Sequence, residues 1–547
     1  EGQTEEDWNL SIAGGKLLQA LAACIGNNIQ SFVMPFVYAN INSNNWRQCE
    51  GALMAFGCIL SGPSAESIQD TVAQAIPGLL QYVRHSHELV ADTSGWVLGV
   101  VCELFPDVFL DVPANLQQLL NIIGPMISAG TEMSKRACTC VHNLALAYED
   151  EEDQTSNELS PYYTDIVRAL LTAIDNQSVQ RLQEVAQETL NVVVDAAAAD
   201  CFQVLLHNVV PEIHRRLGAL LQQRMSTKNA TTQDDIDHLI GLMCGALGGV
   251  AKKLGINMLQ HVPATVDLME GVFRQQTDTV QSEALIVVGA LAQAVQGSFA
   301  QFVPRVMPYI VMALQMVDQE DLCHAAAGTL GDCATALQEH FAPYAESPLV
   351  CIRDSLTNPN VDRDVKCSLL GCLGDVALSI GAQGFLPYLA TFAQIVGTMY
   401  EESKKINFKG DYDSEEYVMG LWESISSFYT GLCQCFNTDV RALTPYLQSI
   451  LVFALEVCHA VPKNDFEDVL AGAIGVIGDL ANILAGADQD LRMNGKNSLL
   501  TTQVREIIRE ALRRKSETIS DQAKWAGKQL TALEHAQTDP PSFGCFS

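Results

Sequence analysis

Apolar residues along this chain recur at helical spacing, and the helices that they predict recur about every forty residues. AAAGTLGDCATAL (325–337), GCLGDVALSIG (371–381) and AGAIGVIGDLANILAG (471–486) show this best, each joining small apolar residues to a Gly-Asp pair. We call the glycine of that pair, and its equivalent in other repeats, the anchor. We expect an anchor-bearing second helix near each of 46–61, 90–105, 132–148, 180–198, 235–254, 280–297, 322–338, 364–381, 414–436, 466–486 and 520–534.

The anchors have the spacing of a solenoid repeat. Two series give steps of 42 and 43 residues: Gly289, Gly331 and Gly374, and Gly57, Gly99 and His142. A period of about 40–47 residues built from paired helices is typical of HEAT or armadillo repeats. These pairs stack into a superhelix with a long concave binding surface. We therefore predict an all-α, HEAT-repeat superhelical solenoid over residues 1–537, of about twelve repeats, followed by a polar tail over 538–547.

First helices should precede these second helices, and two segments interrupt the period. First helices are expected at 76–85, 302–314, 385–400 and 443–458, with Pro77, Pro304, Pro387 and Pro445 at first-turn or kink positions. The acidic segment 148–160 and the segment 401–416 are expected to be solvated loops. Segment 12–26 has the pattern of a second helix without its first helix, so we expect the chain to be the C-terminal part of a longer protein.

Charge and composition narrow the functional classes. Acidic residues outnumber basic ones 64 to 32, giving a net charge of −32 that disfavours nucleic acid as a partner. Solubility alone can explain such a charge, but a solenoid groove can also gather it and attract a basic ligand. The 17 scattered cysteines suit reduced thiols of a cytosolic or nuclear protein. The apolar run 450–458 is stopped by Glu456, so no membrane span is expected.

Two positions of the second helix form a candidate binding stripe. The residue three before the anchor and the residue one after it are four apart and share one helix face. In three repeats these positions hold glycine and aspartate: Gly328 with Asp332, Gly371 with Asp375, and Gly475 with Asp479. Because a core-facing stripe would not carry aspartate, we expect this face to line a solvent-filled groove. The glycine would let another chain approach the helix backbone closely.

Aromatic and acidic residues extend the same stripe toward the N-terminus. Trp96 holds the earlier position in its repeat, Asp92 lies one turn before it, and Glu50 occupies the matching place one repeat earlier. Trp8 follows an acidic opening that contains Glu5, Glu6 and Asp7. A helical tryptophan more often packs in a core, but one exposed beside carboxylates can seat an arginine. Trp46 is expected to be a core residue or a helix start.

Catalytic and metal-binding patterns are missing from the sequence. There is no P-loop, no GxSxG, no HExxH and no dinucleotide-binding glycine pattern. Cys138, Cys140 and His142 lie within one predicted helix and could not surround a zinc ion. We therefore predict that the chain is not an enzyme and needs no cofactor.

Five ordered motifs resemble the HEAT repeats of the importin-β family of nuclear import receptors. They are WRQCEGALMAFGCILSGP (46–63), VADTSGWVLGVVCELFP (90–106), GDVALSIGAQGFLPYL (374–389), VIGDLANILAG (476–486) and AKWAGKQL (523–530). The resemblance covers essentially the whole chain and corresponds to the C-terminal two-thirds of the family, repeats eight to nineteen. The opening EGQTEEDW is similar to the end of the family's acidic loop.

This resemblance implies a partner and a location. It implies binding of the basic N-terminal segment of importin-α, or of basic nuclear-localisation cargo, in the cytoplasm, the nucleus and the nuclear pore. Trp8, Trp96 and Trp525 match family tryptophans that stack on basic side chains, whereas Thr139 stands where the family has one more. The main Ran-GTP site belongs to earlier family repeats, and a second site for nucleoporin FG repeats is implied around 230–380.

A different reading of the same repeats remains. A constitutive HEAT-repeat scaffold, such as a phosphatase regulatory subunit, would also be an acidic all-helical solenoid. Such a scaffold should have near-uniform repeats with hydrophobic ridges and no groove stripe of glycine, aspartate and tryptophan. The stripe therefore favours the transport receptor.

Overall fold

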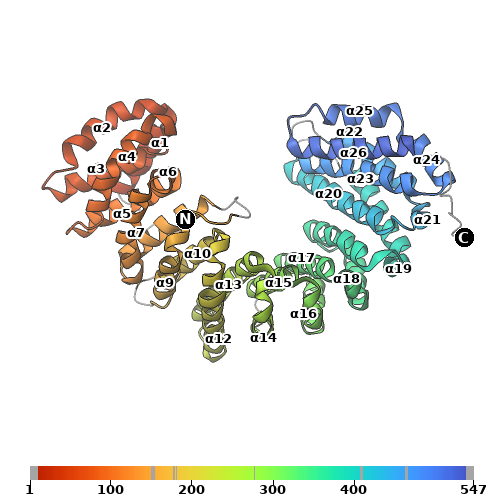
Figure 1. Cartoon of the computed structure of the whole chain (residues 1–547), viewed down its shortest axis with the longest axis horizontal. Coiled ribbons are helices and arrows are strands. Elements are labelled where there is room, and N and C mark those ends of the chain that lie inside the picture. The colour runs from red at the N-terminus through yellow and green to blue at the C-terminus, as the bar shows by residue number, and fades with distance from the viewer. Residues whose placement is uncertain are drawn as a thin grey trace, which may run out of the picture. The chain divides into compact units, whose positions relative to one another are not determined.

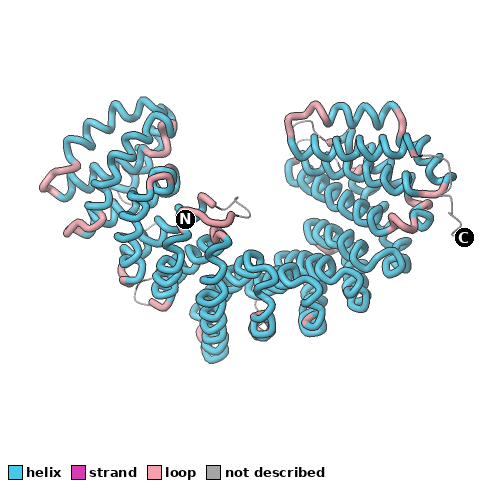
Figure 2. Tube along the Cα trace, viewed as in Figure 1, coloured by secondary structure: helices cyan, strands magenta, loops and turns pink. Residues whose placement is uncertain are grey.

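The computed structural model of the chain describes residues 10–148, 154–176, 179, 181–275, 278–406, 411–461 and 466–536. Within these residues the regular elements are all helices, and no strand occurs (Figure 2). The predicted all-α repeat fold is confirmed. The predicted tail, the acidic opening and Trp8 lie outside the described residues.

The second helices agree with the predicted ones to within five residues at each end (Figure 1). They are α1 (Leu10–Ile25), α3 (Trp46–Ile59), α5 (Glu88–Leu104), α8 (Glu132–Leu146), α10 (Leu182–Asp195), α13 (Ala230–Leu254), α15 (Asp278–Val295), α17 (Glu320–Leu337), the first part of α19 (Arg363–Ser403), α20 (Tyr412–Cys435), α23 (Glu467–Gly486) and α26 (Glu517–His535). The agreement arises because apolar residues recur at helical spacing within each helix, and the face that they form is buried against neighbouring helices.

The first helices alternate with them along the chain. They are α2 (Ile29–Asn40), α4 (Ala65–Tyr82), α7 (Pro113–Ser128), α9 (Tyr163–Ile174), α12 (Val210–Ser226), α14 (Val262–Phe273), α16 (Val303–Gln315), α18 (Glu346–Thr357), the second part of α19, α22 (Leu447–Ala460) and α25 (Thr502–Ala511). Further α-helices outside these pairs are the short α6 (Asp107–Leu110), α11 (Phe202–Val204) and α21 (Val440–Leu443), and the longer α24 (Gln489–Leu499). Gly381 divides α19, because its φ of 70° is a left-handed conformation that favours glycine. Pro304 lies in the first turn of α16, while Pro77 and Pro387 lie inside helices.

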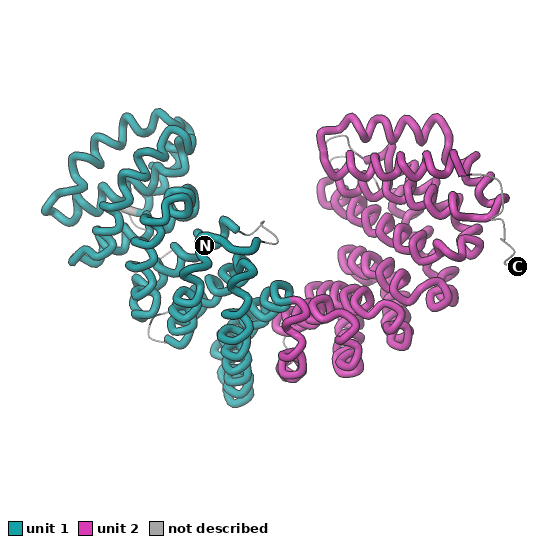
Figure 3. Tube along the Cα trace, viewed as in Figure 1, with its two compact units in different colours: residues 1–254 teal, residues 255–547 magenta. Residues whose placement is uncertain are grey.

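The chain divides into two compact units, residues 1–254 and 255–547, called unit 1 and unit 2 (Figure 3). In unit 1, α3, α5, α8, α10 and α13 pack each on the next. In unit 2, α15, α17, α19, α20, α23 and α26 do the same. The apolar core of each unit lies in these contacts and in those between the two helices of a pair.

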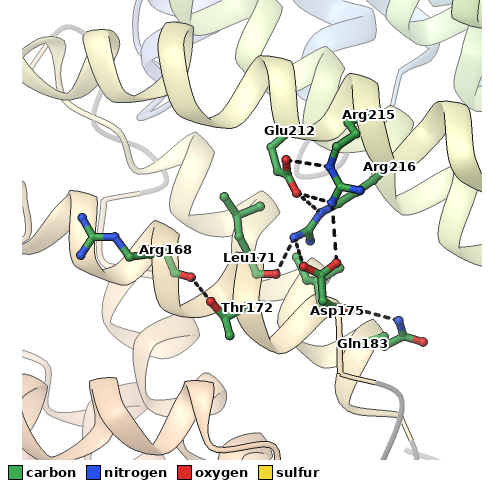
Figure 4. A network of polar contacts seen from close by, with 9 residues as sticks. Arg168, Leu171, Thr172, Asp175, Gln183, Glu212, Arg215 and Arg216 are labelled. Carbon is green, nitrogen blue, oxygen red and sulfur yellow. Dashed lines mark hydrogen bonds and ion pairs between the residues drawn. The ribbon is translucent and has the colours of Figure 1, made fainter.

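A polar network joins the first helices α9 and α12 (Figure 4). Arg216 Nη2 donates to the Leu171 carbonyl at 2.6 Å and to Asp175 Oδ2 at 2.9 Å, while its Nε donates to Glu212 Oε1 at 2.8 Å. The hydrogen bond from Arg215 and the pairing with Arg216 lower the pKa of Glu212 to about 2. The network ties neighbouring repeats together and lies on helices that do not line the grooves described below.

Two predictions about the chain's course need correction. The loop predicted over 401–416 is shorter than expected, because α19 ends at Ser403 and α20 begins at Tyr412. Residues 407–410 of this loop, and residues 149–153 of the other predicted loop, are not described.

The second correction concerns membrane spans. Five segments are long and apolar enough to cross a membrane by length and composition: Ile12–Asn40, Ala230–Gln260, Thr279–Gln301, Arg363–Ser403 and Glu467–Gly486. Composition therefore does not exclude a span. In four of them at least half of the apolar window is buried inside the protein, so helix packing also explains their apolar character.

Candidate peptide-binding grooves

Each unit has a groove across its second helices. The unit 1 groove is lined by residues of α1, α3, α5 and α8 and has a volume of about 770 Å³. The unit 2 groove is lined by residues of α17, α19 and α20 and has a volume of about 540 Å³. Most of the predicted stripe residues lie in one groove or the other.

The unit 2 groove combines carboxylates with an open glycine floor. Asp332 is half-buried, while Asp375 and Glu423 are exposed. Gly328, Gly371 and Gly420 also line the groove, and a Cβ added at any of these three would meet nothing within 4 Å. The helix backbone is therefore accessible from the groove, as the Gly-Asp stripe predicts for the first two glycines.

Like charges act on one another in this groove. Packing around the Asp375 carboxyl, followed by the charge of Asp332, raises the pKa of Asp375. Packing around the Glu423 carboxyl, followed by the charge of Asp468 on α23, which does not line the groove, raises the pKa of Glu423. Among the described residues that line the groove there is no lysine or arginine. A cation supplied by a ligand would therefore relieve this repulsion.

The anchor glycines serve contacts within the chain. A Cβ on Gly289 would collide with the Asp332 carboxylate, and one on Gly331 would lie 3.3 Å from Asp375 Oδ2. Gln293 Nε2 also donates to Asp332 Oδ1 at 3.4 Å. Each aspartate thus packs over the anchor of the preceding repeat, which fixes its position at the edge of the groove.

Asp479 does not face solvent, and the prediction for it is wrong. Its side chain is only 4% exposed and accepts hydrogen bonds from the side chains of Thr430 and Gln434 on α20. Burial raises its pKa to about 6 despite these hydrogen bonds. Gly475, one turn earlier, is buried as well. At this repeat, donors on the neighbouring helix satisfy a carboxyl inside the stack, so the ladder of groove aspartates ends before α23.

The unit 1 groove contains the predicted tryptophan. Trp96 is half-buried and lines the groove with its ring over the anchor Gly57, where a Cβ would collide with it. Thr139 takes the equivalent place one repeat later, with its Cγ2 at 3.4 Å from the Cβ position of Gly99. Replacing the large ring by threonine leaves that position without an aromatic face.

The carboxylates of the unit 1 groove already have partners. Arg136 pairs with Asp92 through two bonds, Nε–Oδ1 at 2.9 Å and Nη2–Oδ2 at 3.1 Å. Glu50 Oε1 accepts from the Thr93 hydroxyl at 3.2 Å. Arg136 is absent from the residues predicted from the sequence. Its separation of 44 residues from Asp92, close to one repeat, is the signal that could have identified it.

A second arginine of this groove lies on an aromatic ring. The Arg47 guanidinium lies 4.4 Å from the centroid of the Trp46 ring, which also stacks on His87 at 3.9 Å. Trp46 is the first residue of α3, as predicted. The chain thus supplies its own cation to one of the groove's tryptophans.

The last predicted tryptophan, Trp525, is not among the residues that line either groove. Trp525 is half-buried on α26, and its ring covers the anchor Gly478, where a Cβ would collide with it. Trp422, which has no counterpart in the family resemblance, is 4% exposed, and its Nε1 donates to Ser403 Oγ at 2.9 Å. Trp8, Glu5, Glu6 and Asp7 lie outside the described residues.

Known proteins share this arrangement of helices. Importin subunit beta-1 of Arabidopsis thaliana is 29% identical over 542 residues, covering 96% of this chain and 60% of the relative. A crystal structure of importin beta superimposes with a TM-score of 0.88 at 23% identity, covering 97% of this chain and 61% of that one. A structure of the Kap95:Nup1 complex gives a TM-score of 0.78 at 23% identity, covering 98% of this chain and 61% of that one.

A family model settles the classification. The chain spans about 60% of the length of the relative from Arabidopsis thaliana. Residues 118–512, well over half of the chain, match the model described as importin subunit beta-1-like, TPR repeats. The anchor steps of 42 and 43 residues exceed the 34 of a tetratricopeptide repeat and fit HEAT repeats. The chain therefore belongs to the importin subunit beta-1-like family.

Proposed function

We propose that this chain is part of a nuclear import receptor and that its unit 2 groove receives a lysine- and arginine-rich segment. The segment would be that of the adaptor importin-α or of a basic nuclear-localisation cargo. The observation that carries the proposal is the set Asp332, Asp375 and Glu423 above an open glycine floor, without a lysine or arginine among the described lining residues. A cationic helix could reach both the carboxylates and the backbone there.

The proposal extends to the pathway. Nup1 is bound by Kap95 in one of the similar structures. By this likeness we assign the chain to carrier-mediated passage between cytoplasm and nucleus through the nuclear pore. A nucleoporin contact around 230–380 and regulation by Ran belong to the same proposal, with the main Ran-GTP contact in repeats that precede those matched here. In this role the chain is a carrier rather than an enzyme.

Binding must be distributed over many contacts. Nanomolar affinity requires about 12 kcal/mol, whereas one exposed ion pair supplies about 0–1 kcal/mol. No single carboxylate can therefore dominate. Further contacts would come from other residues of the second helices: Trp96, Trp525, Glu50 and Asp92. The residues that precede α1 would add Trp8, Glu5, Glu6 and Asp7. Asp479 is removed from the proposed set because it is buried.

The test uses a charge-reversed pair and a matched control. Asp332→Lys with Asp375→Lys changes two groove carboxylates, whereas Glu339→Lys with Glu346→Lys makes the same change at exposed positions outside the groove. We expect the first pair to weaken binding of a fluorescein-labelled basic importin-α peptide by about tenfold or more and the second by far less. Fluorescence anisotropy measures both.

The same titration separates the proposal from the scaffold alternative. Equal losses in the two double variants would show that overall charge, and not the groove, attracts the peptide. A wild-type chain that does not bind the peptide at low salt would contradict the proposal and favour a constitutive scaffold. Membership of the importin family favours the receptor.

A further inference from the structure

Arg136 occupies a distinctive place in the unit 1 groove. It lies on α8 and forms its two-bond pair with Asp92 on α5, one turn before Trp96. The side chains of Arg136 and Asp92 are 40% and 36% exposed, so the pair lies at the groove surface and not in the core. The chain's own guanidinium thus holds the carboxylate that lies beside the groove tryptophan.

The stem of Arg136 is positioned by close packing. A Cβ on Gly95 would lie 3.1 Å from Arg136 Cβ and 3.3 Å from its Cγ. The glycine therefore gives the arginine stem room to lie across α5. This packing lowers the conformational entropy that the side chain must lose to reach Asp92.

The two grooves differ in the charges of the residues that line them. The described lining of the unit 1 groove includes Lys16, Arg47 and Arg136 with only two carboxylates, Glu50 and Asp92. The described lining of the unit 2 groove includes three carboxylates and no lysine or arginine. The three cations of the unit 1 lining outnumber its two carboxylates, so a basic segment would have to compete there with the protein's own cations.

We propose that Arg136 is a specificity-determining residue of the unit 1 groove, because a basic ligand gains Asp92 only by displacing it. This inference rests on the proposed function. An arginine of the ligand can reproduce the two parallel bonds to Asp92, whereas a lysine offers a single point charge. The groove therefore favours ligand arginine over ligand lysine beside Trp96.

The experiment compares two charge-matched variants of the full chain. Arg136→Gln frees Asp92, while Arg168→Gln removes the same charge from an exposed pair with Asp165 on α9, outside the groove. The probes are two fluorescein-labelled basic peptides of equal length and charge, one with arginines and one with lysines. We expect Arg136→Gln to bind both about two- to fivefold more tightly than Arg168→Gln, with the larger gain for the lysine peptide.

Two further variants isolate the parts played by Asp92 and by the geometry of the arginine. Asp92→Asn added to Arg136→Gln should abolish the gain, because the freed carboxylate is then gone. Circular dichroism and thermal melting check the fold. If Arg136→Gln unfolds, Arg136→Lys replaces it, because lysine keeps the charge but loses the two-bond geometry. This variant should still narrow the difference in affinity between the arginine peptide and the lysine peptide.

Each outcome decides the matter. Equal affinities of Arg136→Gln and Arg168→Gln would overturn the inference, since only net charge would then count. Weaker binding by Arg136→Gln would also overturn it, by showing that Arg136 supports the ligand site. Equal gains for the two peptides would overturn it too, because Arg136 would then not discriminate between arginine and lysine. In all three cases a wild type that binds in a salt-dependent way leaves the proposed function intact. A wild type that binds neither peptide would overturn both.

Discussion

Two aspartates at the same repeat position have different surroundings. Asp375 is exposed at the edge of the unit 2 groove, whereas Asp479 is enclosed between α20 and α23 and bonded to Thr430 and Gln434. A raised folded-state pKa means that the folded protein binds the proton more tightly than the unfolded chain does. Ionisation of Asp479 therefore costs stability as pH rises from about 4 to about 6, and the loss remains above that range.

Asp479→Asn should therefore stabilise the protein at neutral pH. The folded pKa of about 6 against 3.8 corresponds to at most about 3 kcal/mol in the free energy of unfolding. The gain should appear at pH 7.5 and vanish near pH 4, as thermal melting across that range would show. Asp375→Asn is the control. The carboxyl of Asp375 is exposed, so its raised pKa corresponds to only a small change in the free energy of unfolding. Identical pH profiles for wild type and Asp479→Asn would contradict the burial argument.

At the scale of the helix, contacts between neighbouring second helices decide whether a glycine can be replaced by a larger residue. Gly51 and Gly57 both lie on α3. A Cβ at Gly51 would meet nothing within 4 Å, whereas one at Gly57 would collide with the Trp96 ring. The two positions share a helix, and only the packing of α5 against α3 distinguishes them.

Gly57→Ala should destabilise the protein by about 1–3 kcal/mol, because Trp96 or α5 must shift to admit the methyl group. Gly51→Ala should be neutral or stabilising by up to about 1 kcal/mol, as expected for alanine in an open helix position. Chemical denaturation measures both. Tryptophan fluorescence should change in Gly57→Ala alone, and equal stabilities of the two variants would rule out the close contact.

At the scale of the whole chain, net charge affects stability and binding in opposite directions. A charge of −32 on 547 residues makes the folded state repel itself, and this repulsion weakens as salt shortens the range of charge interactions. The same screening weakens attraction between the acidic groove and a basic ligand.

We expect added sodium chloride, from about 0.05 to 0.5 M, to raise the melting temperature while it weakens binding of the basic importin-α peptide. Thermal melting and anisotropy on the same samples measure the two effects. Potassium glutamate at matched ionic strength controls for chloride-specific effects. A peptide affinity that does not depend on salt would contradict an electrostatic groove.

The repeat, the class of fold and the place of each second helix follow from the amino-acid sequence alone. Helical periodicity is a local property, so each apolar face is readable from its own segment. The anchor steps and the Gly-Asp pairs at Asp332 and Asp375 also placed those two carboxylates correctly in a groove.

Which members of the stripe face solvent, and which have partners, depends on the packing of one repeat against the next. The burial of Asp479 depends on Thr430 and Gln434 of another helix, and the pairing of Asp92 depends on Arg136, 44 residues later. Such contacts are set by the side chains of the neighbouring repeat. A pattern within one helix cannot contain them, because the same aspartate position is exposed or enclosed according to what packs against it.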